Sequence, residues 1–245
     1  MKLHFLGTTG YHPNNLRQTA CLMFPEIGLI FDAGTGIFRA RDLIQTPTLD
    51  IVLSHVHLDH CVGLTFLYDI LYEKDVKVTV HVEESKIDVI QNHLYQPQLF
   101  PVKPNFEMQP LKPEMKMPYG TIHSFELGYH PGGSHGFRLD LGDRTLAYAT
   151  DTYASEAPEY LKDIRGVDTL IHECYFPDSL DEMAKVTGHS CLGPVVRLAA
   201  AAEVKQLYLV HINPLDPTAA SLDLESAKKI FGNTIVTEDE MVVEI

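Results

Sequence analysis

The sequence predicts a layered α/β or α+β fold, in which two β-sheets pack face to face and helices cover their outer sides. Strand-like runs alternate with helical runs along the whole chain, and an order of several strands followed by a helix occurs twice. The chain has 245 residues, of which 45% are hydrophobic and 21% charged, so it can bury one substantial core. We therefore expect a single domain over residues 1–245.

The first half of the chain carries short strand-like runs separated by loops. The loops at residues 7–15 and 32–36 are rich in turn-forming residues. The proline-rich stretch 94–118 is expected to be irregular, with room for one strand. The expected helical runs are a short one that ends near residue 44, then 62–72 and 85–92. The expected strands are residues 2–6, 19–24, 28–31, 50–54 and 77–82.

The second half repeats the same alternation with longer elements. A Gly142-Asp143 turn joins two adjacent strand-like runs and predicts a hairpin. An alanine-rich helix is expected at residues 192–202, and another helix at 221–231. The expected strands are residues 121–127, 136–141, 145–149, 169–172 and 206–210.

The charge balance is strongly acidic. The formal net charge is −14, and the 19 lysines and arginines are scattered without a basic run. A field of that sign repels polyanions, whereas nucleic-acid-binding proteins usually carry a basic stripe. The composition therefore argues against a large nucleic acid as a partner and favours a small-molecule substrate.

The cysteines and the first residues indicate the compartment. The four cysteines lie far apart and form no CxxC pair, so neither a disulfide framework nor a cysteine-based zinc knuckle is predicted. The opening residues run directly into a strand-like stretch and do not resemble a signal peptide. No run approaches the roughly 18 apolar residues of a membrane helix. We expect a cytoplasmic protein that does not interact with membranes.

A dense cluster of metal-binding residue types follows an apolar strand. His55, His57, Asp59 and His60 lie within six residues of one another, and imidazole and carboxylate groups suit zinc and similar divalent ions. In an extended segment residues two apart share a side, so His55 and His57 can converge on one ion. A turn after them would direct Asp59 and His60 at a second point. This spacing predicts two neighbouring metal ions.

The HxHxDH pattern after a strand resembles the signature of the metallo-β-lactamase superfamily. The resemblance covers nearly the whole chain, because later histidines and aspartates follow in the order that this family shows. It implies a four-layer αββα sandwich with two divalent metal ions at one edge between the sheets. Zinc is the first expectation for these ions, and manganese or iron are the alternatives.

The resemblance also implies which later residues bind the metals. His130 stands in the segment GYHPGG, Asp151 follows the strand-like AYAT, and His211 follows the strand-like LYLV. His135 competes with His130 for its position, and both His135 and His12 are open as residues that contact the substrate. The implied sets are His55, His57 and His130 for one ion, Asp59, His60 and His211 for the other, Asp151 between the two, and Asp32 as the carboxylate that orients a ligand imidazole.

Two short motifs resemble the ribonuclease Z and phosphodiesterase branch of this superfamily. They are His172-Glu173-Cys174-Tyr175 and Thr187-Gly188-His189-Ser190. The resemblance implies that His189 reaches the reacting phosphate and that Glu173 holds it. A histidine whose protonated form is stabilised by a carboxylate can act as a general acid. We therefore name His189 and Glu173, together with Asp59, as the catalytic residues.

The sequence departs from ribonuclease Z in one respect that concerns the substrate. That enzyme carries a long arm that grips tRNA, inserted between the third histidine and the bridging aspartate. Here His130 and Asp151 are only 21 positions apart (151 − 130), which leaves room for two strands and a turn. A compact phosphodiesterase of the carbon–phosphorus lyase pathway has a closer architecture, although its cysteine-containing zinc site has no counterpart here.

These features favour a metal-dependent phosphodiesterase that acts on a small phosphodiester, such as a cyclic nucleotide or a ribose cyclic phosphate. One alternative is a ribonuclease Z-like endonuclease that processes the 3′ end of tRNA. Another is a lactone or thioester hydrolase on the same two metals, which would not need Glu173 and His189. The last is an inactive metal-containing binding protein. The resemblance adds a homodimer as a possible assembly.

Overall fold

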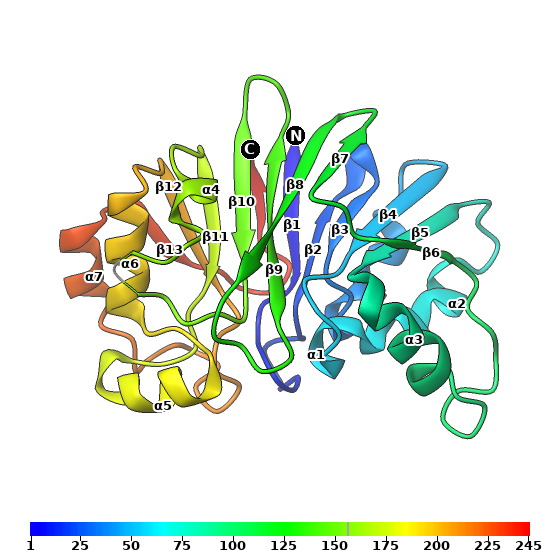
Figure 1. Ribbon diagram of the computed structural model, residues 1–245, viewed down its shortest axis with the longest axis horizontal. Helices are drawn as coiled ribbons and strands as arrows, with labels where there is room; N and C mark the ends of the chain where they lie inside the picture. Colours follow the sequence, from blue (N-terminus) through cyan, green and yellow to red (C-terminus); the bar gives the residue numbers. More distant parts are fainter. Residues whose placement is uncertain (156) are drawn as a thin grey trace. The chain divides into compact units, whose positions relative to one another are not determined.

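The computed structural model describes residues 1–155 and 157–245, and the chain forms two compact units. The first unit contains residues Met1–Lys112 and Glu238–Ile245, and the second contains Pro113–Thr237. Each unit has its own seven-stranded sheet with helices beside it (Figure 1). The expectation of two sheets with accompanying helices is confirmed, whereas the single domain over residues 1–245 stays a prediction.

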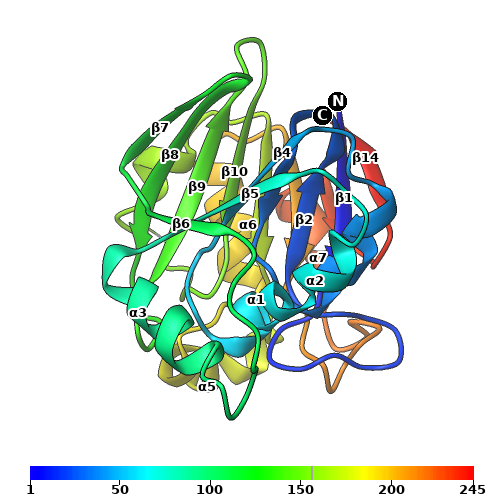
Figure 2. The ribbon, with the colours of Figure 1, turned by 90° about the vertical axis from the view of Figure 1, so that its right-hand side faces the viewer.

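The first unit is built on a mixed sheet of strand order β14-β1-β2-β3-β4-β5-β6. Its C-terminal strand β14 lies beside the N-terminal strand β1 (Figure 2). The pairs from β3 to β6 are parallel, and the others are antiparallel. The strands are β1 (Lys2–Gly7), β2 (Cys21–Phe24), β3 (Leu29–Phe31), β4 (Thr48–Val52), β5 (Lys77–Val82), β6 (Glu107–Pro110) and β14 (Val242–Glu244).

Short helical segments follow strands β2 to β5 of this unit. Apolar side chains of the segments after β3, β4 and β5 join those of the strands in one buried cluster, because strands covered by helices bury both of their faces. The segments are the 3-10 helices η1 (Pro25–Ile27), η2 (Thr35–Asp42), η3 (Val62–Phe66) and η4 (Glu84–Lys86), the α-helices α1 (Leu58–Cys61), α2 (Leu67–Ile70) and α3 (Ile87–Val89), and the π-helix η5 (Ile90–Leu94).

The second unit has a sheet of strand order β13-β12-β11-β10-β9-β8-β7. The strands from β7 to β10 are antiparallel neighbours, and β10, β11, β12 and β13 are parallel to one another. The strands are β7 (Glu114–Met117), β8 (Gly120–Leu127), β9 (Ser134–Asp140), β10 (Thr145–Ala149), β11 (Thr169–Glu173), β12 (Gln206–Val210) and β13 (Thr234–Val236). The helices are α4 (Leu161–Ile164), η6 (Asp178–Leu180), α5 (Asp181–Thr187), α6 (Leu192–Ala201) and α7 (Leu224–Ile230).

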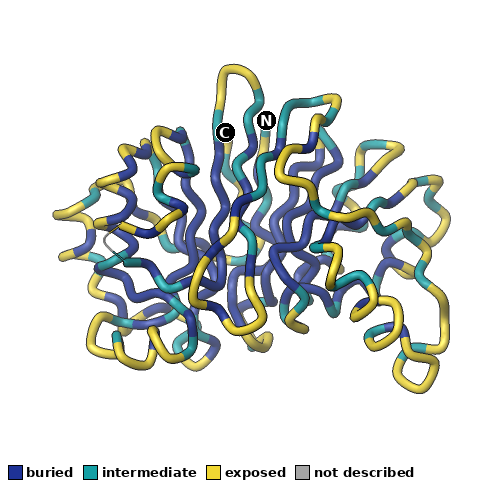
Figure 3. Tube along the Cα trace, in the orientation of Figure 1, coloured by how far each residue is buried: buried dark blue, intermediate teal, exposed yellow. Residues whose placement is uncertain are grey.

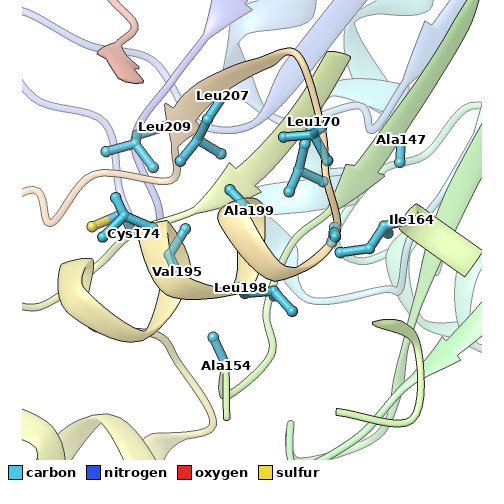
Figure 4. Close-up of a cluster of buried hydrophobic side chains, with 14 of the residues drawn as sticks. Ala147, Ala154, Ile164, Leu170, Cys174, Val195, Leu198, Ala199, Leu207 and Leu209 are labelled. Atoms are coloured by element: carbon cyan, nitrogen blue, oxygen red, sulfur yellow. The ribbon is translucent and has the colours of Figure 1, made fainter. Parts of the chain in front are cut away.

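Helix α6 packs on the parallel strands of the second unit. Ala199 faces Leu207 and Leu170 of the strands, and all three are fully buried (Figure 4). The alanine-rich helix that the sequence predicts here is α6, and its buried residues include Ala199. Buried positions run along the strands of both units (Figure 3). This packing holds the ends of the parallel strands in place.

Most of the predicted elements are confirmed within one or two residues. Strands β5, β10 and β12 have the predicted bounds, and α6 ends one residue early. The expected helix at 62–72 is divided into η3 and α2. The expectation of one strand in 94–118 is wrong, because β6 and β7 both form there at sheet edges. An edge strand pairs with only one neighbouring strand, so it can form from a segment with a weak pattern of alternating apolar residues.

Other elements were not predicted at all. Helices α4 and α5 and the edge strands β13 and β14 are short, and short elements leave little periodic signal. In the described part of the chain, no helix is long and apolar enough to cross a membrane.

Candidate metal-binding and catalytic residues

The first unit presents a cluster of histidines and aspartates just after β4. His55 and His60 are buried, whereas the His57 side chain is exposed. The His55 ring lies 4.5 Å from the His57 ring and 4.3 Å from the His60 ring, measured between centroids. His57 keeps an extended backbone and Asp59 and His60 enter α1, so the chain turns where the sequence predicts.

Asp32 and Ser54 hold the His60 ring. The Ser54 amide and hydroxyl donate to the two carboxylate oxygens of Asp32, at 2.7 and 2.9 Å. The carboxylate also contacts Nδ1 of His60, which lies 2.9 Å from Asp32 Oδ2. This bond orients the ring so that Nε2, which lies 3.4 Å from Asp59 Oδ2, is the atom available to a metal. Asp32 therefore stands where a residue that orients a ligand imidazole is expected.

Asp59 is held by the loop that follows β1. The Tyr11 amide donates to Asp59 Oδ2 at 2.7 Å. Asp239, in the C-terminal segment, fixes this loop by accepting from the Thr8 amide at 3.0 Å, the Thr8 hydroxyl at 2.7 Å and the Gln18 amide at 2.6 Å. Arg39 donates to the same carboxylate at 2.5 Å. A buried charged group with this many partners makes the loop rigid.

Glycine is required where α1 meets the loop after β3. A side chain at Gly34 would come within 2.2 Å of the Asp59 carbonyl oxygen, and one at Gly63 within 2.3 Å of the Gly34 carbonyl oxygen. The glycines that the sequence places in and beside these turns therefore allow α1, with Asp59 and His60, to lie against the segment that carries Asp32.

The second unit presents a separate group of buried histidines and an aspartate. Asp151 Oδ2 lies 3.4 Å from Nε2 of His130, and Asp151 Oδ1 lies 3.2 Å from Nε2 of His211. Each carboxylate oxygen thus faces a different imidazole, an arrangement that suits an aspartate shared by two metal ions. His130 also has its Nδ1 3.2 Å from the carbonyl oxygen of Gly188.

Parallel strands explain why these side chains meet. Strands β10, β11 and β12 are parallel neighbours, so the residues after them come to one edge of the sheet. Asp151 and His211 both follow such strands, and Glu173 ends β11. Asp32 follows β3 of the first unit in the same way, beside the parallel strand β4.

Backbone strain marks three of these positions. Asp32, Asp151 and His211 have φ angles of 58°, 52° and 55°, in the left-handed region that favours glycine. A side chain at such a position costs conformational energy of order 1 kcal/mol or more. Retaining carboxylate and imidazole groups at all three strand ends indicates that the side chains have a function there.

Glu173 and His189 form a pair beside the His130, Asp151 and His211 group. Nδ1 of His189 lies 3.2 Å from both carboxylate oxygens of the fully buried Glu173. The carboxylate also accepts from the Thr152 amide at 2.6 Å and the Ser190 amide at 3.2 Å. These contacts fix Glu173 and leave Nε2 of His189 directed away from it. Glu173, His189 and His211 each offer an atom within 4.8 Å of the others.

Two aromatic or imidazole groups support this pair. The Tyr175 ring stacks on the His189 ring at 4.8 Å, with 17° between the planes. Behind Glu173, His172 is fully buried, with Nδ1 2.8 Å from the Glu173 carbonyl oxygen and Nε2 2.9 Å from the Tyr160 hydroxyl. Burial lowers the pKa of His172, so the ring is neutral and can donate from Nδ1 while it accepts at Nε2.

His135 and His12, the two predicted candidates for substrate contact, lie outside the groups described above. His135 lies within β9, opposite Glu126 of β8, and it is His130 that faces Asp151. His12 is exposed in the first loop, beside the Tyr11 ring. Sequence reasoning missed the roles of Ser54, Tyr175 and the Tyr11 amide. Only Ser54, next to the histidine cluster, carried a signal that could have pointed to it.

Comparisons with known proteins show which family the chain resembles. The model of the "Beta-lactamase superfamily domain" family matches residues 29–212. Ribonuclease Z from Archaeoglobus fulgidus is 27% identical over an alignment that covers 100% of this chain and 97% of that protein. The alignment spans 301 positions, so at least 56 of them (301 − 245) have no counterpart in this chain.

Solved structures confirm the fold class. The metallo-beta-lactamase fold protein YhfI from Bacillus subtilis matches 99% of this chain and 99% of its own, with a TM-score of 0.81 and 19% identity. Human tRNase Z, short form, matches 100% of this chain and 99% of its own, with a TM-score of 0.77 and 20% identity. The expected metallo-β-lactamase sandwich is therefore the fold of the chain.

The comparisons correct the expected function. The sequence favoured a small phosphodiester as the substrate, because the chain is acidic and lacks the long arm. That expectation is wrong, since four relatives named ribonuclease Z each match 98–100% of the chain. The missing arm and the acidic net charge were weaker indicators of the substrate than similarity along the whole chain. The ribonuclease Z-like alternative is the better supported one.

Proposed function

Because the chain belongs to the beta-lactamase superfamily, in its metallo-β-lactamase and ribonuclease Z-like branch, we propose that it is a metal-dependent endonuclease that cleaves precursor tRNA at its 3′ end. The observation that carries the proposal is the buried Glu173 with His189 held on it, 3.2 Å from both of its oxygens. The ribose oxygen that leaves an RNA phosphodiester needs such a proton donor, whereas we expect that a lactone or thioester does not.

The two His and Asp groups fit a pair of divalent metal ions. By the family resemblance, His55, His57 and His130 would hold one ion, and Asp59, His60 and His211 the other, with Asp151 shared. Asp32 supports this fit, because it occupies Nδ1 of His60 and leaves Nε2 for a metal. Imidazole and carboxylate donors suit zinc first, and manganese or iron as alternatives. Bound ions of this kind lower the pKa of a coordinated water and neutralise phosphate charge.

Residues of the chain would carry out the proton transfers of the reaction. Protonated His189 would donate its Nε2 proton to the ribose oxygen that leaves, while Glu173 stabilises the positive charge on the ring. The Tyr175 ring, stacked on the His189 imidazole, holds the plane of that imidazole in place. Asp59, whose Oδ2 is held by the Tyr11 amide, would accept a proton from the attacking water. General acid–base help of this kind typically contributes about 10²–10⁴ in rate.

The acidic charge limits how the RNA is held. The turn between β9 and β10 stands between His130 and Asp151, and no long arm is inserted there. A net charge of −14 opposes binding of a long polyanion, so the proposed contact with tRNA is short and close to the cleaved bond. A second copy of the chain could extend it, and the homodimer stays a prediction. The cytoplasm, where all four buried cysteines would remain reduced, is the proposed compartment.

The test uses purified, metal-loaded protein and a precursor tRNA with a 3′ trailer. Wild type should release the trailer, and His189→Ala should cut more slowly by about 10²-fold or more. His93→Ala, an exposed histidine of η5, is the matched control and should cut like wild type. A panel of lactones and thioesters is assayed in parallel. Turnover of an ester that survives His189→Ala, with the tRNA left intact, would overturn the proposal.

A further inference from the structure

The segment before His130 carries an exposed aromatic ring. Tyr129 is 68% exposed, although its neighbour His130 is buried. Its φ angle of 77° lies in the left-handed region, where a glycine would be free of strain. The chain places glycine at 128, 132 and 133 but keeps a tyrosine here. A large exposed ring retained on a strained backbone next to a candidate metal ligand points to a function of the ring itself.

The Tyr129 ring is braced from one side. It meets the Tyr153 ring edge-on, with centroids 5.8 Å apart and 72° between the planes. The Tyr153 hydroxyl donates to the Asp181 carboxylate, at 3.1 and 3.3 Å from its two oxygens. The Thr152 hydroxyl donates to the Gly128 carbonyl oxygen at 3.1 Å. The ring is thus supported along an edge, while most of its surface remains open to a ligand.

The backbone of Tyr129 also packs against the loop that carries His189. A side chain added at Gly188 would come within 2.5 Å of the Tyr129 carbonyl oxygen and 2.7 Å of the His130 Cα. Tyr129 and His130, a proposed metal ligand, therefore both lie against the loop that carries His189, the proposed donor to the leaving ribose oxygen. If the leaving ribose oxygen of a nucleotide lies at His189, the base of that nucleotide can reach the Tyr129 ring.

We propose that Tyr129, braced by Tyr153, is a stacking platform for the unpaired base of the nucleotide whose 3′ oxygen leaves. This rests on the proposed function, and it names the part of the RNA that the site recognises. Base–aromatic stacking needs no positive charge and tolerates any base. It therefore suits a chain with a net charge of −14, because that charge opposes the binding of a long polyanion.

The experiment is a double-substitution cycle on RNA and protein. Tyr129→Leu and Tyr129→Phe are compared on a precursor tRNA with a normal base, or an abasic ribose, on the 5′ side of the cleaved bond. On the normal RNA, Tyr129→Leu should raise KM by about tenfold with a smaller change in kcat, and Tyr129→Phe should resemble wild type. On the abasic RNA, Tyr129→Leu and wild type should have equal KM. Tyr72→Leu, another exposed tyrosine at 64%, is the control.

A binding readout separates this inference from the proposed function. The RNA carries 2-aminopurine at the same position, and stacking on Tyr129 should quench its fluorescence with wild type and Tyr129→Phe, but not with Tyr129→Leu. The stacking inference is overturned if wild type gives no quenching, or if Tyr129→Leu weakens normal and abasic RNA equally. If quenching depends on Tyr129 but no RNA is cut, the proposed endonuclease activity fails and the stacking site stands. Thermal unfolding confirms that the variants fold.

Discussion

Asp32 Oδ2 lies 2.9 Å from Nδ1 of His60, and both side chains are fully buried. Ser54 donates to both oxygens of the same carboxylate. The carboxylate therefore acts on the proposed site through the orientation of the His60 ring. Partners of this kind usually affect metal affinity nearly as strongly as the ligands do.

Replacing Asp32 tests this relationship. Asp32→Asn should lower metal affinity by about 10- to 100-fold, because the amide cannot accept at both positions that Ser54 and His60 occupy. Asparagine tolerates the left-handed backbone at this position, so the fold should persist. Metal content after dialysis against a graded chelator is the measurement. Asp50→Asn, which removes the charge from a similar 2.9 Å contact with His81, is the control, and equal retention of metal by both variants would contradict the prediction.

Glu173→Gln separates general-acid support from a merely structural role. The variant should lower kcat on precursor tRNA by about 10²-fold with unchanged metal content, because the imidazolium of His189 loses its carboxylate. Bis-p-nitrophenyl phosphate has a leaving group that needs no protonation, so its turnover should fall much less. A similar loss on both substrates would show that Glu173 only maintains the structure of the site.

The buried His172 predicts how stability depends on pH. Burial lowers its pKa in the folded protein, whereas in the unfolded chain it titrates near the ordinary value of 6.5. The unfolded state then binds more protons, so the free energy of unfolding should fall as pH drops below about 6.5. Urea unfolding at pH 7.5 and 5.5 checks this. At pH 7.5 the free energy of unfolding of His172→Gln should be about 1–3 kcal/mol below that of wild type. Between pH 7.5 and 5.5 it should fall less than that of wild type. An equal fall in both proteins would show that other groups cause the pH dependence.

Asp239 predicts a long-range effect on the first loop. Asp239→Ala should lower the free energy of unfolding by roughly 2–4 kcal/mol, because it leaves Arg39 and the Thr8 and Gln18 amides without their carboxylate. It should also lower metal content, since the same loop carries the Tyr11 amide that holds Asp59. Denaturant unfolding and metal analysis are the measurements.

The control for Asp239 is an exposed ion pair. Glu203→Gln removes the partner of Arg165, at 3.7 Å on the surface, and should change stability by less than about 1 kcal/mol. If Asp239→Ala leaves metal content unchanged while it lowers stability, the loop supports the fold but does not position Asp59.

The sequence by itself determined the local features of this protein. The strands before Asp151, Glu173 and His211 were predicted because apolar runs bounded by turns are local patterns. The HxHxDH segment was likewise visible, since its spacing is contained in six residues. The ends of adjacent parallel strands then bring Asp151, Glu173 and His211 together, as the order of elements allows.

The tertiary structure alone decided the rest. Asp239 lies 231 positions from Thr8, and no local pattern predicts a hydrogen bond between them. The Tyr11 amide is a backbone group, so its hydrogen bond to Asp59 does not depend on the residue type at position 11 and cannot be predicted from it. The left-handed backbones of Asp32, Asp151 and His211 are imposed by surrounding contacts against the intrinsic preference of these residues. Such features depend on packing between distant segments, and packing is decided only when the whole chain has folded.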